Sequence, residues 1–180
     1  MNIIRIYLVI IGLLIIFGLG CIQSGKVTPA TQESCDQSLW NHVYNPSRLQ
    51  INESCKTVTG FIEYIKKEPD GDDHIRLKLD PAYANLINQK NIEKQYGDLV
   101  LEPICKNPIT QKDAILPCKG FHQNFSVSIG QHIKVTGAYV LDMQHGWMEI
   151  HPITSMAKID NVTIEVTNTN DSTNDSNNFE

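Results

Sequence analysis

The stretch "TVTGFIEYIKKEPDGDDHIRLKLD", residues 57–80, predicts two β-strands joined by a tight turn. Its first half is rich in β-branched and aromatic residues, which favour strands, and it carries Gly60 where a bulge or a strong bend would fit. The proline, aspartates and glycine of "EPDGDD" (68–73) are typical of a turn, and a weak divalent-cation site is the alternative. In "HIRLKLD" (74–80) apolar and charged residues alternate, so we expect one face of this strand to be buried and the other to face solvent.

Three further segments have strand character, and one has helical character. The predicted strands are "DLVLEPIC" (98–105), "QHIKVTGAYVLD" (131–142) and "WMEIHPITSMAKI" (147–159). Between the second and third strands, "AYANLINQKNIEKQY" (82–96) has apolar residues at roughly helical spacing, and Gly97 stands where a helix C-cap would. The sequence therefore predicts an all-β domain of five strands with one helix.

The order of these segments resembles an OB-fold, a small five-stranded Greek-key barrel. The residues that carry the resemblance to OB domains of the anticodon-binding and helicase-associated type are "VTGFIEYI", "HIRLKLD", "DLVLEPI", "GQHIKVTGAYV" and "EIHPITSMAKI". The resemblance implies that the fifth strand lies beside the third. Unlike the usual OB arrangement, the predicted helix follows the second strand, and a cysteine-containing loop joins the third strand to the fourth. The chain also resembles an uncharacterised group of exported OB-like proteins with "DGD-x-HI" and "EIHP" signatures.

The two ends of the chain differ in composition from this domain. Residues 1–21 combine Arg5, an apolar run and a glycine before Cys21, which is typical of an export signal or a membrane anchor. The Gly–Cys pair also resembles the lipobox of bacterial and archaeal lipoproteins, which implies lipidation of Cys21. We expect residues 22–34 to form a tether, 35–160 the folded domain, and 161–180, rich in Asn, Thr, Ser and Asp, a disordered tail. The domain is then exported and anchored to the cell membrane on its extracytoplasmic side.

Four cysteines lie in the predicted domain: Cys35, Cys55, Cys105 and Cys118. An even number of cysteines in an exported chain indicates disulfides, and three pairings are open. The sequence-local pairing, Cys35 with Cys55 and Cys105 with Cys118, would close two modest loops, each contributing about 2–4 kcal/mol of stability. A four-thiolate zinc site is the alternative, although the chain has no C-x-x-C pair.

The charge of the domain bears on its partners. Residues 35–160 contain thirteen lysines and arginines against fifteen aspartates and glutamates, a net charge of −2. Generic binding to nucleic acid needs a basic footprint, which this composition lacks. Five N-x-S/T sequons agree with an extracytoplasmic surface. A surface glycan or a protein is therefore the expected partner, and the membrane is contacted through the N-terminus.

Histidine and carboxylate residues form the candidate site. On a strand, Trp147, Glu149 and His151 point to one side, and Glu102 is expected on the neighbouring third strand. Together with His74, at the start of the second strand, the residues Glu102, Glu149 and His151 could bind zinc or manganese, or act as an acid–base pair. The alternative to a binding module is therefore a metal-binding domain with hydrolytic activity that uses these four residues. In the other interpretation, they form a hydrogen-bonded cluster that fixes the strand register and closes the barrel.

The sequence shows no motif of an activated nucleophile or of a nucleotide-binding loop, since G-x-S-x-G, Walker A and G-x-G-x-x-G patterns are all missing. We therefore expect a binding domain rather than an enzyme, with no cofactor unless a divalent metal binds the His–Glu cluster. The candidate ligand-binding residues are Arg76, Lys78 and Trp147, which the OB resemblance implies lie on or beside the ligand face.

Overall fold

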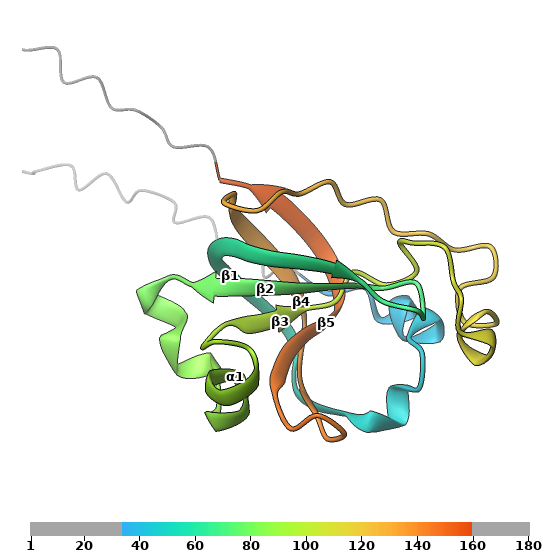
Figure 1. Ribbon diagram of the computed structural model, residues 1–180, viewed down its shortest axis with the longest axis horizontal. Coiled ribbons are helices and arrows are strands. Elements are labelled where there is room, and N and C mark those ends of the chain that lie inside the picture. The colour runs from blue at the N-terminus through green and yellow to red at the C-terminus, as the bar shows by residue number, and fades with distance from the viewer. Residues whose placement is uncertain (1–33, 160–180) are drawn as a thin grey trace, which may run out of the picture. The chain divides into compact units, whose positions relative to one another are not determined.

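The computed structural model describes residues 34–159, and its main element is a five-stranded sheet closed into a barrel (Figure 1). The strands are β1 (Leu49–Lys67), β2 (Asp73–Leu79), β3 (Leu99–Leu101), β4 (His132–Asp142) and β5 (Met148–Lys158). Their order around the barrel is β1-β2-β3-β5-β4; β3 and β5 are parallel, and the other neighbours are antiparallel. The prediction of a small, mostly-β domain is confirmed.

Short helices lie before and between the strands. They are the 3-10 helices η1 (Gln37–His42), η2 (Pro46–Arg48), η3 (Pro81–Leu86) and η4 (Lys112–Ala114), and the α-helix α1 (Gln89–Lys94). The prediction of one helix over 82–96 is wrong, because the segment is split at Ile87 and Asn88. Ile87 has an extended backbone, and the Asn88 side chain accepts hydrogen bonds from the first turn of α1, so a new helix begins there.

The first strand is longer than predicted, and its length closes the barrel. β1 begins at Leu49 rather than at Thr57; its first part, as far as Phe61, pairs with β4, and its last part, from Gly60 on, pairs with β2. Gly60 lies where both pairings meet, and a Cβ atom there would overlap the carbonyl oxygen of Lys78. Glycine is therefore required by the close approach of two backbones.

Aliphatic side chains fill the barrel. Ile75 and Leu77 of β2 are fully buried, whereas Arg76 and Lys78 are not, which confirms the alternation predicted for 74–80. Fully buried residues of the other strands include Val58, Ile62, Leu99, Leu101, Ile133, Val135, Ile150 and Ile153. A second cluster packs η1 and the loop after β3 against β4; it includes Leu39, Val43, Ile104, Ala138 and Val140.

Two disulfides, Cys35–Cys55 and Cys105–Cys118, tie the periphery to the barrel. They confirm the sequence-local pairing and exclude the four-thiolate zinc site, because the four sulfurs are bonded to one another in pairs. The first disulfide joins the segment before η1 to β1. The second lies within the loop between β3 and β4, and its two cysteines are part of the second apolar cluster.

The remaining predictions for the chain ends fall outside the described residues. They concern the leader at 1–21, the lipidation of Cys21, the tether at 22–34 apart from its last residue, and the tail at 161–180. Within residues 34–159, no helix has the length and apolar character that crossing a membrane would require.

Candidate functional site

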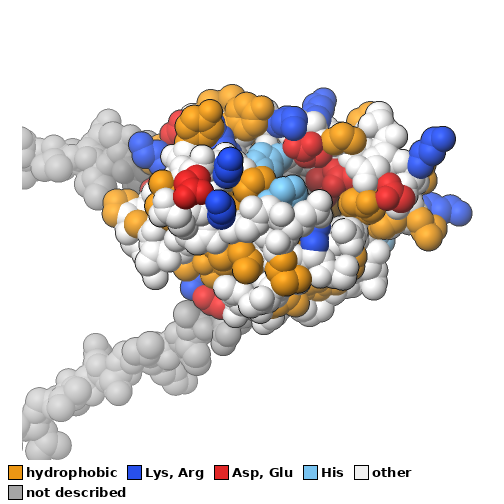
Figure 2. Space-filling model, turned by 60° about the horizontal axis from the view of Figure 1, so that its bottom comes forward, with side chains coloured by type: hydrophobic (Ala, Val, Ile, Leu, Met, Phe, Trp, Pro, Cys, Tyr) orange, Lys and Arg blue, Asp and Glu red, His pale blue; other side chains and the backbone are white. Residues whose placement is uncertain are grey.

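A cavity of about 630 Å³ lies where the β1–β2 turn, β2, the segment after α1 and the β4–β5 turn meet. Its walls combine charged and amide side chains with the aromatic rings of Tyr64, Tyr96 and Trp147. On one face of the molecule, histidine side chains lie between acidic and basic groups, with hydrophobic side chains around them (Figure 2). This size falls within the range of small-ligand sites, and the lining is more polar than in most of them.

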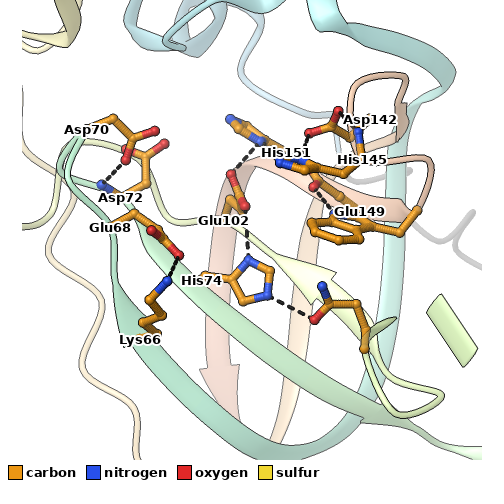
Figure 3. Close-up of polar contacts among 12 residues, drawn as sticks. Lys66, Glu68, Asp70, Asp72, His74, Glu102, Asp142, His145, Glu149 and His151 are labelled. Carbon is orange, nitrogen blue, oxygen red and sulfur yellow. Dashed lines mark hydrogen bonds and ion pairs between the residues drawn. The ribbon is translucent and has the colours of Figure 1, made fainter. Parts of the chain in front are cut away.

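Four residues singled out from the sequence meet in one hydrogen-bonded network (Figure 3). Glu102, directly after β3, lies at its centre: His74 Nδ1 is 3.3 Å from Glu102 Oε1, and His151 Nδ1 is 3.0 Å from Glu102 Oε2. His151 Nδ1 also lies 3.2 Å from Glu149 Oε2. His74 Nε2 donates to Gln95 Oε1 over 3.0 Å, so both of its ring nitrogens are engaged. The structure therefore brings His74, Glu102, Glu149 and His151 together, but His74 has no nitrogen free for a metal.

The burial of β5 differs from the expected pattern. Strand alternation predicts that Met148 and Ile150 face the core while Glu149 and His151 face outward. In the structure all four are buried, and Glu149 and His151 have no exposed surface. β5 pairs with β4 on one edge and, at Glu149 and Ile150, with β3 on the other. Other parts of the chain cover it as well: the Gln123 side chain of the long loop between β3 and β4 donates to the backbone of β5 over 2.7 Å. The strand is therefore buried on both faces where it carries the site.

A buried ion cluster continues from this network to the β4–β5 turn. The Arg48 guanidinium pairs with Asp142 and lies 3.5 Å from Glu102 Oε2. Asp142 has no exposed surface and also accepts hydrogen bonds from the backbone and the ring of His145, with the ring nitrogen 2.8 Å away. The His145 ring stacks on Trp147, and their centroids are 4.4 Å apart. Arg48, which no sequence pattern indicated, therefore helps to hold the turn that carries Trp147.

Two of the three residues predicted to bind a ligand line the cavity. Arg76 and Trp147 lie in its wall, whereas Lys78 lines a smaller neighbouring cavity of about 340 Å³. The Arg76 guanidinium contacts two aromatic rings, 4.4 Å from the centroid of Tyr96 and 5.0 Å from that of Tyr64. These cation–π contacts hold the guanidinium against the rings. Neither tyrosine was indicated by the sequence, because each occurs singly and no pattern links it to a site.

Burial and hydrogen bonding shift the pKa values of the network in different directions. Burial disfavours a charge on His151, but its hydrogen bonds to Glu102 and Glu149, and the charges of these groups, outweigh burial and raise the pKa of His151 to about 10. Burial alone would raise the pKa of Glu102, yet hydrogen bonds from His151 and His74 hold it well below its ordinary value. Burial and the charge of Glu102 raise the pKa of Glu149. Glu102 is therefore the carboxylate that holds a negative charge beside the histidines.

Asp72, at the end of the β1–β2 turn, extends the site. It is 3% exposed, and its Oδ1 accepts a hydrogen bond of 2.7 Å from the backbone N–H of Cys105. Burial raises the pKa of Asp72 to about 8, against the opposing charge of His151. In Figure 3, Asp70 and Asp72 lie on one side of His151, and Glu149 lies on its other side. The local sequence favours a turn here over a cation site, and it gives no sign that Asp72 lies beside His151 of β5.

Comparison with known proteins provides no relative from which a function could be transferred: no protein-family model, no curated protein and no solved structure matches the chain. The barrel and the geometry of the site therefore provide the basis for a function. The features that bear on it are the cavity, the aromatic rings in its wall and the buried His–Glu network.

Proposed function

We propose that the chain is an exported, membrane-anchored OB-like module that binds an oligosaccharide in the cavity. The position of the cavity carries this proposal, because its lining comes from the β1–β2 turn, β2, the residue after β3 and the β4–β5 turn. OB barrels bind oligosaccharides and oligonucleotides on the face of strands 2 and 3, between the loops that join strands 1–2 and 4–5. The strand order β1-β2-β3-β5-β4 and the parallel pairing of β3 with β5 support the OB-like assignment.

The chemistry of the cavity favours a sugar over a nucleic acid. A sugar ring has apolar C–H faces, which pack on aromatic rings, and hydroxyl groups, which need donors and acceptors close together. Tyr96 and Trp147 supply rings, and Gln95 and Arg76 supply polar groups beside them. Tyr96 is 85% exposed, so a ligand can reach its ring. The net charge of −2 over residues 35–160 provides no basic footprint for a phosphate backbone.

The location outside the cytoplasm is supported by two observations. Disulfides form and persist in oxidising compartments, and both pairs of domain cysteines are joined. Residues 1–21 have the composition of an export signal or anchor. A domain at the cell surface meets glycans and proteins there, and a protein partner is the other ligand class that suits a cavity with aromatic walls.

Replacing Tyr96 with alanine is expected to weaken glycan binding about tenfold, because an aromatic contact contributes roughly 1 kcal/mol or more beyond the area it buries. The full-length protein is screened on a glycan array, and a retained glycan is then titrated by calorimetry. Trp147→Ala should weaken binding similarly, but Trp147 Nε1 also donates to the buried Glu149, so this change disturbs the site as well. Tyr96→Ala is therefore the cleaner variant.

The matched control is Phe61→Ala. Phe61 is 43% exposed and stacks on His132, and it is not among the residues that line the cavity. Glycan affinity should stay unchanged in this variant. Failure of the wild-type protein to retain any glycan, or an equal loss of affinity in Phe61→Ala and Tyr96→Ala, would contradict the proposal. Retention of a surface protein that Tyr96→Ala no longer binds would favour the protein ligand instead.

A further inference from the structure

Three buried residues from distant parts of the chain form a second feature beside the cavity. Asp72 ends the β1–β2 turn, Glu102 follows β3, and His151 lies on β5. Each offers one metal-ligating atom, and these three atoms lie within 4.8 Å of one another. The exposed fractions of the residues are 3%, 7% and 0%. The group is therefore a compact donor set inside the protein rather than an acidic patch on its surface.

Two donor atoms of this group lack a hydrogen-bond partner. Within residues 34–159, Asp72 Oδ2 and His151 Nε2 are the buried side-chain atoms that remain without one. The other polar atom of each side chain is engaged: Asp72 Oδ1 accepts from Cys105, and His151 Nδ1 lies close to Glu102 and Glu149. Leaving a buried polar atom unpaired is unfavourable. That two such atoms occur in one three-residue group points to a species that binds both.

We propose that Asp72 Oδ2 and His151 Nε2 bind one divalent transition-metal ion, zinc or manganese, while Glu102 orients the His151 ring through Nδ1. A carboxylate and an imidazole suit these ions, and water can fill the remaining coordination positions. The carboxylates beside His151 Nδ1 keep the proton on that nitrogen and leave Nε2 as the ligand, an arrangement common around metal-bound histidines. Binding releases any proton held on Nε2 to solvent. The site does not depend on glycan binding, although Glu102 also lines the cavity.

This set differs from the metal site predicted from the sequence. His74 drops out because both of its ring nitrogens are engaged. The oxygens of Glu102 and Glu149 are engaged as well. Of the predicted residues only His151 therefore remains as a ligand, and Asp72 joins it. A second possible group, Asp142, His145 and Glu149, carries no such inference. Asp142 already pairs with Arg48 and His145, and the Glu149 oxygens contact Trp147 and His151. Only the first group combines close donors with unpartnered buried atoms.

Metal content tests the proposal directly. The untagged full-length protein is stripped with a chelator, loaded with Zn²⁺ or, separately, Mn²⁺, dialysed and analysed by mass spectrometry for metal. We expect about one ion per wild-type chain with at least one of the two metals. Asp72→Asn, which keeps the shape of the side chain, should weaken the affinity measured by calorimetry by about 10- to 100-fold.

The matched control is Asp73→Asn. Asp73 is a neighbouring buried aspartate, but Asn107 donates to one of its oxygens over 2.7 Å and Lys106 pairs with the other over 2.8 Å. Metal affinity should therefore remain at the wild-type value. The proposal is overturned if the folded wild-type protein holds no stoichiometric metal. That result is expected if water alone bridges Asp72 and His151. Unchanged affinity in a folded Asp72→Asn variant overturns it as well.

A spectroscopic measurement keeps the proposal testable if a variant fails to fold. Co²⁺ held by protein ligands in a four- or five-coordinate site absorbs visible light much more strongly than the hydrated ion at the same concentration. One equivalent of Co²⁺ added to stripped wild-type protein should give such a band, and one equivalent of Zn²⁺ should remove it. Absence of the band at full occupancy, or a band that zinc leaves unchanged, would show that this group does not ligate the ion.

Discussion

Replacing Arg48 with methionine is expected to lower the free energy of unfolding by about 3–5 kcal/mol. The guanidinium pairs with Asp142 and lies 3.5 Å from Glu102, and the exposed fractions of the three side chains are 11%, 0% and 9%. Methionine fills much of the same volume but leaves Asp142 and Glu102, both buried, without the charge of the guanidinium. The loss is measured by urea titration of the metal-free protein with both disulfides intact, and tryptophan fluorescence is the signal.

Lys66→Met is the matched control for Arg48→Met. Lys66 pairs with Glu68 over 2.9 Å, but the two side chains are 55% and 27% exposed. Such surface pairs contribute less than about 1 kcal/mol, because water screens them and holding two long side chains costs entropy. We expect a change of that size or smaller. If both methionine variants lost the same stability, burial would not be the cause of the Arg48 effect.

Gly137→Ala is expected to cost about 3 kcal/mol, at the upper end of what overpacking a well-packed core costs. Gly137 of β4 faces β5, where a Cβ atom would overlap the carbonyl oxygen of Pro152 and lie 2.6 Å from Ile150 Cγ2. A backbone oxygen of a paired strand cannot rotate away as a side chain can. The same urea titration measures the loss, and the β5 segment that carries His151 must shift to accept the methyl group.

The control for Gly137→Ala separates steric overlap from backbone preference. Gly120 has φ 77°, a left-handed conformation that alanine adopts at a cost of roughly 1 kcal/mol, and no atom lies within 4 Å of a Cβ placed there. Gly120→Ala should therefore lose about a third as much stability. A comparable loss in the two variants would mean that the packing of β4 against β5 is looser than the structure indicates.

Local sequence patterns predict the strands and buried residues in some parts of this fold and not in others. The alternation in 74–80 correctly places Ile75 and Leu77 in the core, because that strand has one apolar and one polar face. Residues 49–56, "LQINESCK", show no such alternation and are mostly exposed, yet they form the first part of β1. They are extended because β4 offers them hydrogen-bonding partners, and such long-range pairing leaves no mark on a short stretch of sequence.

The candidate site shows the same division. Its histidines and glutamates could be named from the sequence, because His74, Glu102, Glu149 and His151 lie on or next to predicted strands. Their burial could not be foreseen, since it depends on how the long loop and the chain before β1 cover the outside of the barrel. Asp72 belongs to the group only because the loop after β3 brings the Cys105 backbone to it, a contact between segments that local pattern cannot predict.

The closed barrel has a consequence for how copies of this chain behave when crowded together. Each of the five strands has a hydrogen-bonded neighbour on both sides over part of its length, so within residues 34–159 no strand of the barrel wall has one edge unpaired throughout. Unpaired edges are the templates on which other chains add strands and aggregate. A domain built in this way offers neighbouring copies few unpaired strand edges on which to extend a β-sheet.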